Sequence, residues 1–144
     1  MEEINWEDFY KIVEIFCLNA KKKDLNKGRM SRLYFIQHGN KGPIKIGFTR
    51  DPVWYRLQNL QPGTPIELKL LFYKETLPDV PRTQAHPLEK YLQRKFSDSR
   101  IRGEWFNPTM DLITHIIQEI TKSWYYQNAL LIMSTISTES TMST

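Results

Sequence analysis

Four side chains in the middle of the sequence have the types that phosphodiester hydrolysis requires. They are a tyrosine, a lysine, an arginine and a glutamate, at Tyr34, Lys45, Arg56 and Glu89. A carboxylate can hold a Mg²⁺ ion that keeps most of its waters, and the ion polarises the phosphate and stabilises the departing oxygen. Arginine offers a fork of donors to phosphate oxygens, and a tyrosine or lysine can handle the proton of an attacking water. This set of residues therefore predicts a site for phosphodiester hydrolysis.

Two of the four side chains lie in a predicted β-hairpin. Residues 33–36 and 44–49 are rich in aliphatic and aromatic residues, and the turn-forming segment 38–43 separates them. The antiparallel pair carries Tyr34 on its first strand and Lys45 on its second. On an ideal strand Lys45 has the opposite parity to Ile44 and Ile46, so it projects away from their face.

The other two side chains lie on predicted helices. Arg56 follows Asp51 and Pro52, which predict a helix start with Asp51 as the N-cap. Glu89 follows Pro87, which predicts the start of a second helix. Both charged residues neighbour residues that face the core, so each is expected at the edge of a buried helix face. The buried stripe predicted for the second helix consists of Leu88, Tyr91, Leu92 and Phe96.

The remaining pattern completes a small α+β fold. Residues 4–20 predict an amphipathic helix, residues 66–73 a third strand, residues 74–86 a loop, and Asn107 and Pro108 the start of a last helix that runs through Ile120. The eleven residues from Ser134 onward are mostly Ser and Thr, which is typical of disorder. We expect three parts: a helix and basic linker (1–28), a catalytic domain (29–122), and an apolar segment with a polar tail (123–144).

Spacing alone leaves a second interpretation of the four residues open. Three ordinary exposed charges and one core tyrosine would produce the same pattern. The three histidines, His38, His86 and His115, are too scattered for a metal triad, and each is expected at the surface or in a loop.

The charge is unevenly distributed along the chain. Residues 1–20 contain five acids and one base, a net charge of −4. Residues 21–56 contain ten bases and two acids, a net charge of +8, and residues 82–102 contain six bases and two acids, a net charge of +4. Clustered Lys and Arg release counterions from phosphate, so the two basic blocks favour a polyanionic partner, although solvated surface charge would look the same.

Composition excludes several classes of protein. The 144 residues, 40% hydrophobic and 12% aromatic, suffice for one domain with a core and argue against wholesale disorder. The single cysteine, Cys17, excludes an intramolecular disulfide and a cysteine-based zinc cluster. No apolar run approaches the roughly 18 residues of a membrane span, and the acidic start differs from a signal peptide. We therefore expect a soluble intracellular protein without a membrane partner, located in the cytoplasm (of the host cell, if the protein is viral).

The order of five short motifs resembles a known nuclease superfamily. LYFI at 33–36 is followed by KIGFT at 45–49, with eleven residues from Tyr34 to Lys45, and then by Arg56. Leu-Glu at 88–89 and GEWF at 103–106 come later. This order resembles the GIY-YIG nuclease superfamily, and most closely its small phage, viral and bacterial branch with a KIG motif.

The resemblance implies a three-stranded antiparallel sheet flanked by helices, to which the chain adds the N-terminal helix predicted from its periodicity. It also implies a metal-dependent endonuclease, a hydrolase that cleaves DNA phosphodiesters with Mg²⁺ or Mn²⁺. By position, Tyr34 matches the general base or water-orienting tyrosine, Arg56 the arginine that grips the scissile phosphate, and Glu89 the single metal-binding carboxylate. Lys45 replaces the second tyrosine, so Tyr34 and Lys45 remain rival general bases.

Further residues have expected roles around this site. Glu104 is a candidate second acid, although a structural hydrogen bond or a role before the last helix is favoured for it. Asn107 is a candidate for the superfamily's late asparagine, but it is also the expected N-cap of the last helix. The N-terminal helix and residues 124–132 lie outside the resemblance and are expected to pack on the domain or on a second copy, which would give a homodimer. Five basic residues are expected to contact the DNA backbone, namely Arg50, Arg94, Lys95, Arg100 and Arg102.

Two other functions stay open. A nucleic-acid-binding module could keep this fold without turnover, binding DNA with steep salt dependence. Another nuclease type would use the acid-x-lysine pair Glu67 and Lys69 together with an upstream acid, for which only Asp51 offers itself.

Overall fold

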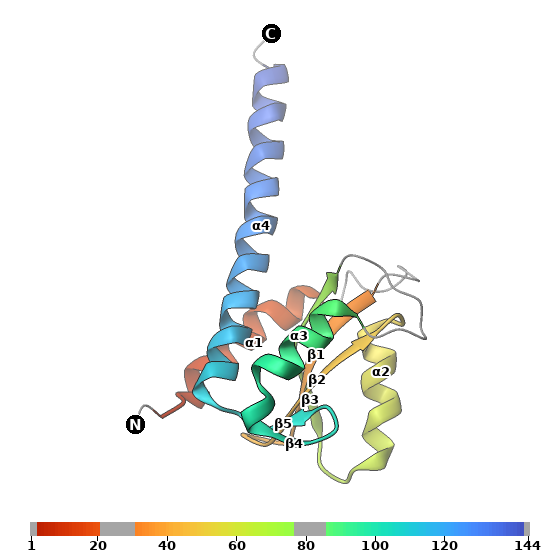
Figure 1. Cartoon of the computed structure of the whole chain (residues 1–144). Coiled ribbons are helices and arrows are strands. Elements are labelled where there is room, and N and C mark those ends of the chain that lie inside the picture. The colour runs from red at the N-terminus through yellow and green to blue at the C-terminus, as the bar shows by residue number, and fades with distance from the viewer. Residues whose placement is uncertain (1–2, 21–30, 77–85, 143–144) are drawn as a thin grey trace.

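The computed structural model describes residues 3–20, 31–76 and 86–142 (Figure 1). The predicted basic linker and much of the predicted loop before Pro87 lie outside these residues. Two short 3₁₀ turns, Gln61–Gly63 and Ser97–Ser99, connect some of the elements. The helices and strands are α1 (Trp6–Ala20), β1 (Ser31–His38), β2 (Ile44–Thr49), α2 (Val53–Leu60), β3 (Leu68–Thr76), α3 (Pro87–Lys95), β4 (Arg100–Arg102), β5 (Trp105–Phe106) and α4 (Met110–Met142).

The α+β class is confirmed, but the sheet has five strands instead of the three expected. All its pairs are antiparallel, in the order β3-β1-β2-β5-β4. The three predicted strands form one side of the sheet, and β5 and β4 extend it beyond β2. These two added strands are two and three residues long. An alternating pattern needs about four residues to be visible, so neither strand has a sequence signature.

Strand β1 is buried on both faces because helices cover both sides of the sheet. Leu33 and Phe35 belong to the main core, with α1, α3 and α4 on that side. Tyr34 and Ile36 face the opposite way and pack with Val53 of α2 in a second, smaller core. Figure 1 shows α2 separated from the other helices by the sheet. Tyr34, the predicted site residue of β1, therefore lies in the layer between the sheet and α2.

A register shift in β3 changes which residues face which core. The expected strand 66–73 placed Leu68, Leu70 and Phe72 on one face, but β3 begins at Leu68, and Ile66 is 45% exposed. The β1–β3 pairing shifts between Phe35 and Ile36, so Phe72 joins the main core and Leu70 the smaller one. A bulge of this kind inserts one residue and reverses the alternation beyond it.

Helix α3 begins at Pro87 as predicted, but two other predicted helix starts are displaced. The N-cap of α2 is Pro52, not Asp51, and no side chain caps this end. The last helix begins at Met110, where the Thr109 hydroxyl accepts a hydrogen bond from the Leu112 N–H at 3.2 Å. Asn107 therefore lies before the helix and does not cap it. Asn107 and Pro108 indicate that a helix follows, but the last helix begins where the Thr109 hydroxyl accepts a hydrogen bond from a free N–H group of its first turn.

Helix α4 is much longer than predicted. It continues through Trp124 and through the Ser/Thr-rich tail as far as Met142, and Figure 1 shows its C-terminal part extending away from the sheet. Trp124 and Tyr125 are 45% and 64% exposed, so these two residues do not pack on the domain as expected. The homodimer expected through the terminal segments remains a prediction. In the described part of the chain, no helix combines the length and the apolar character that a membrane crossing requires.

Gly47 is opposite Tyr34 in the β1–β2 ladder, where no side chain would fit. A Cβ at position 47 would lie 2.4 Å from Tyr34 Oη and 2.5 Å from Tyr34 Cζ. Real Cβ atoms essentially never come this close, and the tyrosine is fully buried, so it has no open space to move into. The glycine therefore provides the space for the tyrosine ring.

Gly47→Ala is expected to displace Tyr34 and lower the free energy of unfolding by about 1–3 kcal/mol, the usual range for overpacking. Thermal or urea unfolding measures the change. Gly63→Ala is the matched control, since a Cβ there meets nothing within 4 Å. Equal stability of the two variants would show that the space around Tyr34 is not restrictive.

Candidate active site

Tyr34 and Arg56 meet on the α2 side of the sheet. Arg56 Nε donates a hydrogen bond to Tyr34 Oη at 3.3 Å. Burial raises the pKa of the Tyr34 phenol, against the lowering effect of Arg56, so the phenol keeps its proton at neutral pH. The same hydrogen bond raises the pKa of the Arg56 guanidinium. The pair is thus a neutral phenol that holds a permanent cation in place.

Lys45 makes an ion pair with Glu104 next to Tyr34 and Arg56. Lys45 lies on β2, opposite Ile36 of β1, and its side chain projects toward the α2 side as its parity predicted. Its Nζ lies 2.9 Å from Glu104 Oε2 and 5.6 Å from the centre of the Trp105 ring. With Lys45 only 9% exposed, the carboxylate supplies the charge that a buried ammonium needs. Glu104 therefore holds the Lys45 charge in the site.

Glu89 reaches the same Glu104 from helix α3. The two carboxyl groups share a hydrogen bond. Burial, with further contributions from that bond and from the charge of Glu104, raises the pKa of Glu89 to about 7, and the Lys45 ammonium partly opposes the rise. Within α3, Gln93 Nε2 donates a hydrogen bond to Glu89 Oε1 at 3.3 Å. Two half-buried carboxyl groups thus lie in contact.

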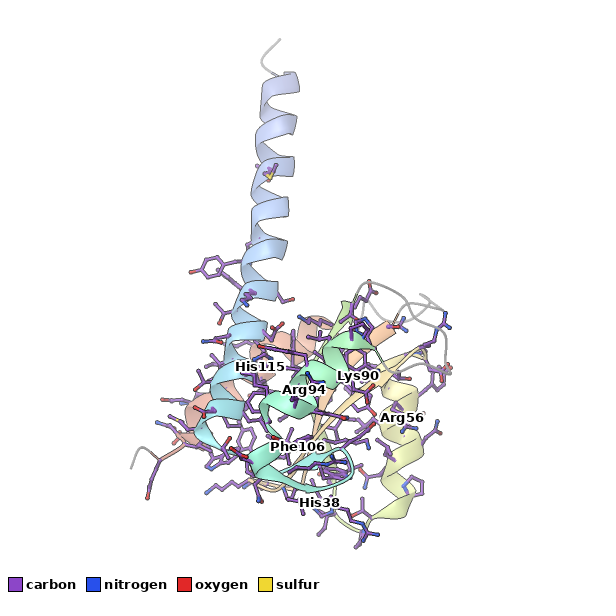
Figure 2. All side chains as sticks on the ribbon, in the orientation of Figure 1. His38, Arg56, Lys90, Arg94, Phe106 and His115 are labelled. Carbon is purple, nitrogen blue, oxygen red and sulfur yellow. The ribbon has the colours of Figure 1, made fainter. Side chains whose placement is uncertain are left out.

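The structure brings all four predicted site residues together. The charges of Glu104 and Glu89 both act on Tyr34, and the charge of Glu104 also acts on Arg56. Two neighbouring strands and two helices from opposite sides of the sheet contribute the predicted residues, and Glu104 joins them from the loop between β4 and β5. Figure 2 shows Arg56 on α2 and, across from it, Lys90 on the helix that carries Glu89.

Glu104 is a site residue for which the sequence left a structural role open. Its position follows from the pairing of Lys45 with Trp105 across β2 and β5, and from the Ile46 N–H, which donates to the Glu104 carbonyl at 3.0 Å. The GEWF segment could have indicated it, because an acid next to two aromatic residues lies where a core meets the surface. The short strand that fixes its direction had no signal of its own.

His86 is a second residue with an unexpected role. It lies in the loop before α3, in agreement with the expected surface or loop position, but it is only 3% exposed. Its Nδ1 accepts a hydrogen bond from the Leu88 N–H at 3.1 Å, which makes it the N-cap of α3. Its ring stacks on Phe48 of β2, with centroids 4.7 Å apart. The contact ties the start of the Glu89 helix to the strand of Lys45.

The buried stripe of α3 is narrower than predicted. Leu92 is fully buried and Phe96 is 5% exposed, as expected. Tyr91 is instead 56% exposed, because it lies on the outer face of the helix. His115 of α4 is half-buried and makes edge contacts with Phe35 and Phe96, so it too departs from the expected surface position.

The residues expected to contact DNA lie outside this cluster. Arg94 and Lys95 are exposed in the last turn of α3, and Arg100 and Arg102 are exposed on β4. Arg50 is half-buried after β2, and its carbonyl accepts a hydrogen bond from Arg32 Nη1 at 2.9 Å. Their role in binding remains a prediction.

The residues of the acid-x-lysine alternative, Glu67 and Lys69, do not come together in a site. Glu67 precedes β3 and is exposed. Lys69 lies against α1, with its Nζ 4.8 Å from the centre of the Tyr10 ring. Its neighbours Leu68 and Leu70 face the smaller core with Tyr34, so Lys69 points to the other side of the sheet.

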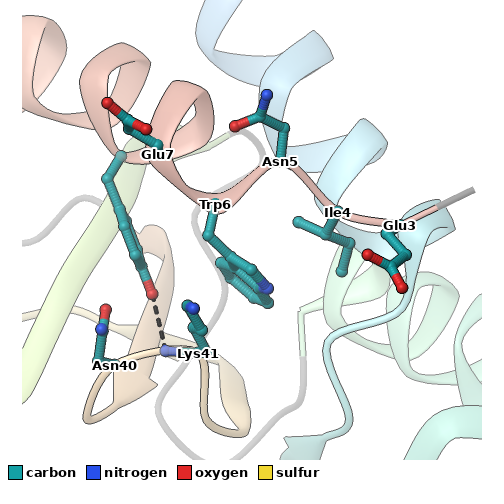
Figure 3. A pocket seen from close by; sticks show the side chains of 8 residues that line it. Glu3, Ile4, Asn5, Trp6, Glu7, Asn40 and Lys41 are labelled. Carbon is teal, nitrogen blue, oxygen red and sulfur yellow. Dashed lines mark hydrogen bonds between the residues drawn. The ribbon is translucent and has the colours of Figure 1, made fainter.

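A separate hollow of about 590 Å³ opens between the start of α1 and the β1–β2 turn (Figure 3). Tyr10 closes one wall, where its hydroxyl accepts a hydrogen bond from the Lys41 N–H at 2.8 Å. None of the predicted site residues lines it. Its lining is Glu3, Ile4, Asn5, Trp6, Glu7, Tyr10, Asn40 and Lys41.

Comparison with known protein families gives one match, to the T5orf172 domain over residues 32–124. The matched segment covers more than half of the chain and contains every site residue described above. The chain belongs to the T5orf172 domain family. No curated protein and no solved structure gave a match.

The family assignment corrects the resemblance to the GIY-YIG superfamily, which was wrong: no family of that superfamily matches the chain. The motifs behind the resemblance are one to five residues long. The first of them has Arg32 and Leu33 where that superfamily has its glycine and isoleucine. In the T5orf172 domain these short runs have local physical reasons, such as the fit of Gly47 to Tyr34.

The carboxyl pair predicts a pH-dependent stability. The pKa of Glu89 is higher in the folded protein than its ordinary value of 4.5, so the folded state binds more protons between about pH 4.5 and 7. The stabilisation is present below pH 4.5 and is lost as the pH rises through about 7. In EDTA, the free energy of unfolding should fall by about 1–2 kcal/mol over this range, after allowance for the exposure of the group.

Glu89→Gln should remove this part of the pH dependence, because the amide does not titrate. Urea unfolding at several pH values measures it, with the exposed Glu75→Gln as the matched control. An unchanged slope in the Glu89 variant would mean that the two carboxyl groups do not share a proton.

Proposed function

We propose that this T5orf172 domain is a metal-dependent endonuclease that hydrolyses DNA phosphodiester bonds. The observation that carries the proposal is the contact between the Glu89 and Glu104 carboxyl groups beside two fixed cations, Lys45 and Arg56. Membership of a phage-associated domain family that is often nuclease-like supports a DNA-related function. The net charge of +4 is also favourable for a polyanionic substrate.

The carboxyl pair suits a hard divalent cation. Mg²⁺ and Mn²⁺ prefer carboxylate and water oxygens, and Mg²⁺ is commonly held by one or two carboxylates plus several waters. Among the residues that the structure describes, no group of three or more His, Cys, Asp or Glu side chains gathers, so Glu89 and Glu104 are the natural ligands. Bound there, the ion would polarise the scissile phosphate and stabilise the leaving oxygen.

Arg56 is the proposed phosphate-gripping residue. It is partly exposed on α2, and among the described residues its guanidinium donates a hydrogen bond from Nε to Tyr34. The terminal nitrogens can then donate to two phosphate oxygens as negative charge develops on them. Tyr34 itself is fully buried, so we assign it the role of holding the guanidinium in place.

Lys45 is better suited to stabilising charge than to removing a proton. Its ammonium is paired with Glu104 at 2.9 Å, and an ammonium has no free lone pair to act as a base. The raised pKa of Tyr34 likewise keeps that phenol protonated. The two rival general bases of the sequence are thus, in this structure, a fixed cation and a hydrogen-bonding phenol.

Plasmid nicking with Mg²⁺ or Mn²⁺, and with EDTA, tests the proposal. Wild-type protein should cut only with metal, and Glu89→Gln should lose at least about 100-fold in rate, as for loss of one dominant electrostatic group. Glu75→Gln, an exposed glutamate on β3, should cut normally. Salt-sensitive DNA binding without metal-dependent cleavage would identify a binding module instead, and neither activity would remove the DNA function altogether.

A second prediction separates Tyr34 from Arg56. Tyr34→Phe removes only the hydroxyl and should slow nicking by about 10- to 100-fold, while Arg56→Ala slows it further. Because Tyr34 acts through the guanidinium, the double variant should be no slower than Arg56→Ala alone. Single-turnover nicking rates measure this. Additive losses would instead mean that the Tyr34 hydroxyl contacts the reacting groups itself.

A further inference from the structure

The hairpin formed by β4 and β5 presents its outer strand entirely to solvent. Every residue of β4 is exposed, and the strand forms one edge of the sheet. It consists of Arg100, Ile101 and Arg102, so a half-exposed apolar side chain stands between two cations. The loop after it contains Glu104, which places the hairpin directly beside the proposed active site.

Ile101 occupies an irregular position in the strand pairing. Arg100 pairs with Phe106 and Arg102 with Trp105, so the register shifts between the two arginines and Ile101 has no residue opposite it. A bulge of this kind re-aims side chains, and such bulges are frequent at sheet edges and next to active sites. Ile101 is 50% exposed in spite of the apolar cores nearby.

The hairpin is held in this shape before any partner arrives. Arg100 Nε donates to the Gly103 carbonyl at 2.7 Å across the turn, where Gly103 has a φ of +57°. At the base, the Asn107 N–H donates to the Ser99 carbonyl at 2.8 Å, and Phe106 is fully buried. A preorganised element loses little conformational entropy when it binds.

We propose that the β4 edge inserts into a groove of duplex DNA next to the cleavage site. Arg100 and Arg102 contact phosphates, and Ile101 makes an apolar contact with sugars and base edges between them. The location next to a cleavage site rests on the proposed nuclease function, but the inference concerns DNA binding and not cleavage. Apolar side chains inserted beside arginines are a recurrent way of holding DNA grooves.

DNA fits this edge better than an added peptide strand does. Strand addition needs a regular row of free backbone groups, whereas β4 is three residues long and interrupted by the register shift. The two flanking cations match a polyanion. A partner that binds by phosphates and groove contact uses all three side chains.

Binding of a fluorescent 25-base-pair duplex, followed by anisotropy in EDTA at several salt concentrations, tests the proposal without any cleavage. Ile101→Ser should weaken binding about five- to tenfold and leave the salt dependence unchanged, because no counterion is released at an uncharged side chain. The double variant Arg100→Ala/Arg102→Ala should weaken binding and lower the slope of log K against log salt by about two.

Ile66→Ser is the matched control, since Ile66 is 45% exposed but lies just before β3, away from the hairpin. Ile101→Val keeps an apolar group and should bind almost as well as wild type, which separates lost contact from lost folding. An Ile101→Ser affinity within twofold of the Ile66→Ser affinity would overturn the proposal.

The outcomes also separate this proposal from the nuclease function. Normal binding by Ile101→Ser in a protein that nicks plasmid overturns only the groove contact. Weak binding by Ile101→Ser in a protein that never nicks supports the groove contact and overturns the enzyme. A wild-type protein that does not bind duplex DNA overturns both.

Discussion

Across the β1–β2 ladder, the ring of Tyr34 fills the space that any side chain at position 47 would need. This close approach lets the phenol lie flat in the small core and still reach Arg56 on α2. Without it, the ring would have to leave the layer between the sheet and α2, and Arg56 would lose the hydrogen bond that fixes its guanidinium. The position of the Arg56 guanidinium therefore depends on the absence of one Cβ.

The two carboxyl groups of the site lie close together, although the formal charges of the site balance. Lys45 and Arg56 carry two positive charges, and Glu89 and Glu104 would carry two negative ones. Burial, with the hydrogen bond and the repulsion between the two carboxyl groups, raises the pKa of Glu89 to about 7. A DNA phosphate would add another negative charge, and under the proposed function a divalent cation at the carboxyl pair would offset it. Without a metal, the half-burial of Glu89 favours its protonated form.

Sequence analysis succeeded where the chain has local signals of sufficient length. The three longer strands, the helices around Arg56 and Glu89, and the direction of Lys45 could all be predicted from alternation, proline and helical spacing. The convergence of Tyr34, Lys45, Arg56 and Glu89 also agreed with the predicted set. These features depend on contacts between neighbouring elements, which periodicity reports directly.

The failures have a common physical origin in non-local pairing. Strand β5 forms because it pairs with the edge of β2, and β4 forms because it pairs with β5. Two or three residues are too few for an alternating sequence pattern to predict either strand. The bulge in β3 likewise depends on its pairing with β1, whereas the Thr109 cap is a local hydrogen bond to the Leu112 N–H. The superfamily resemblance rested on short motifs, and these record local requirements, such as the space for Tyr34, that sheets of different families can share.

Steering and chemistry occupy different parts of the molecule. The charge of Lys45 is buried and already matched by Glu104, so it contributes little to the field that a distant polyanion experiences. The arginines of β4 are exposed, and their charges extend about one Debye length, roughly 8 Å at physiological salt, into solvent. Under the proposed function, attraction of DNA should therefore depend on the exposed edge, whereas the proposed reaction depends on the buried cations. Because Glu104 follows β4 and pairs with Lys45, DNA held at that edge would lie beside the carboxyl pair.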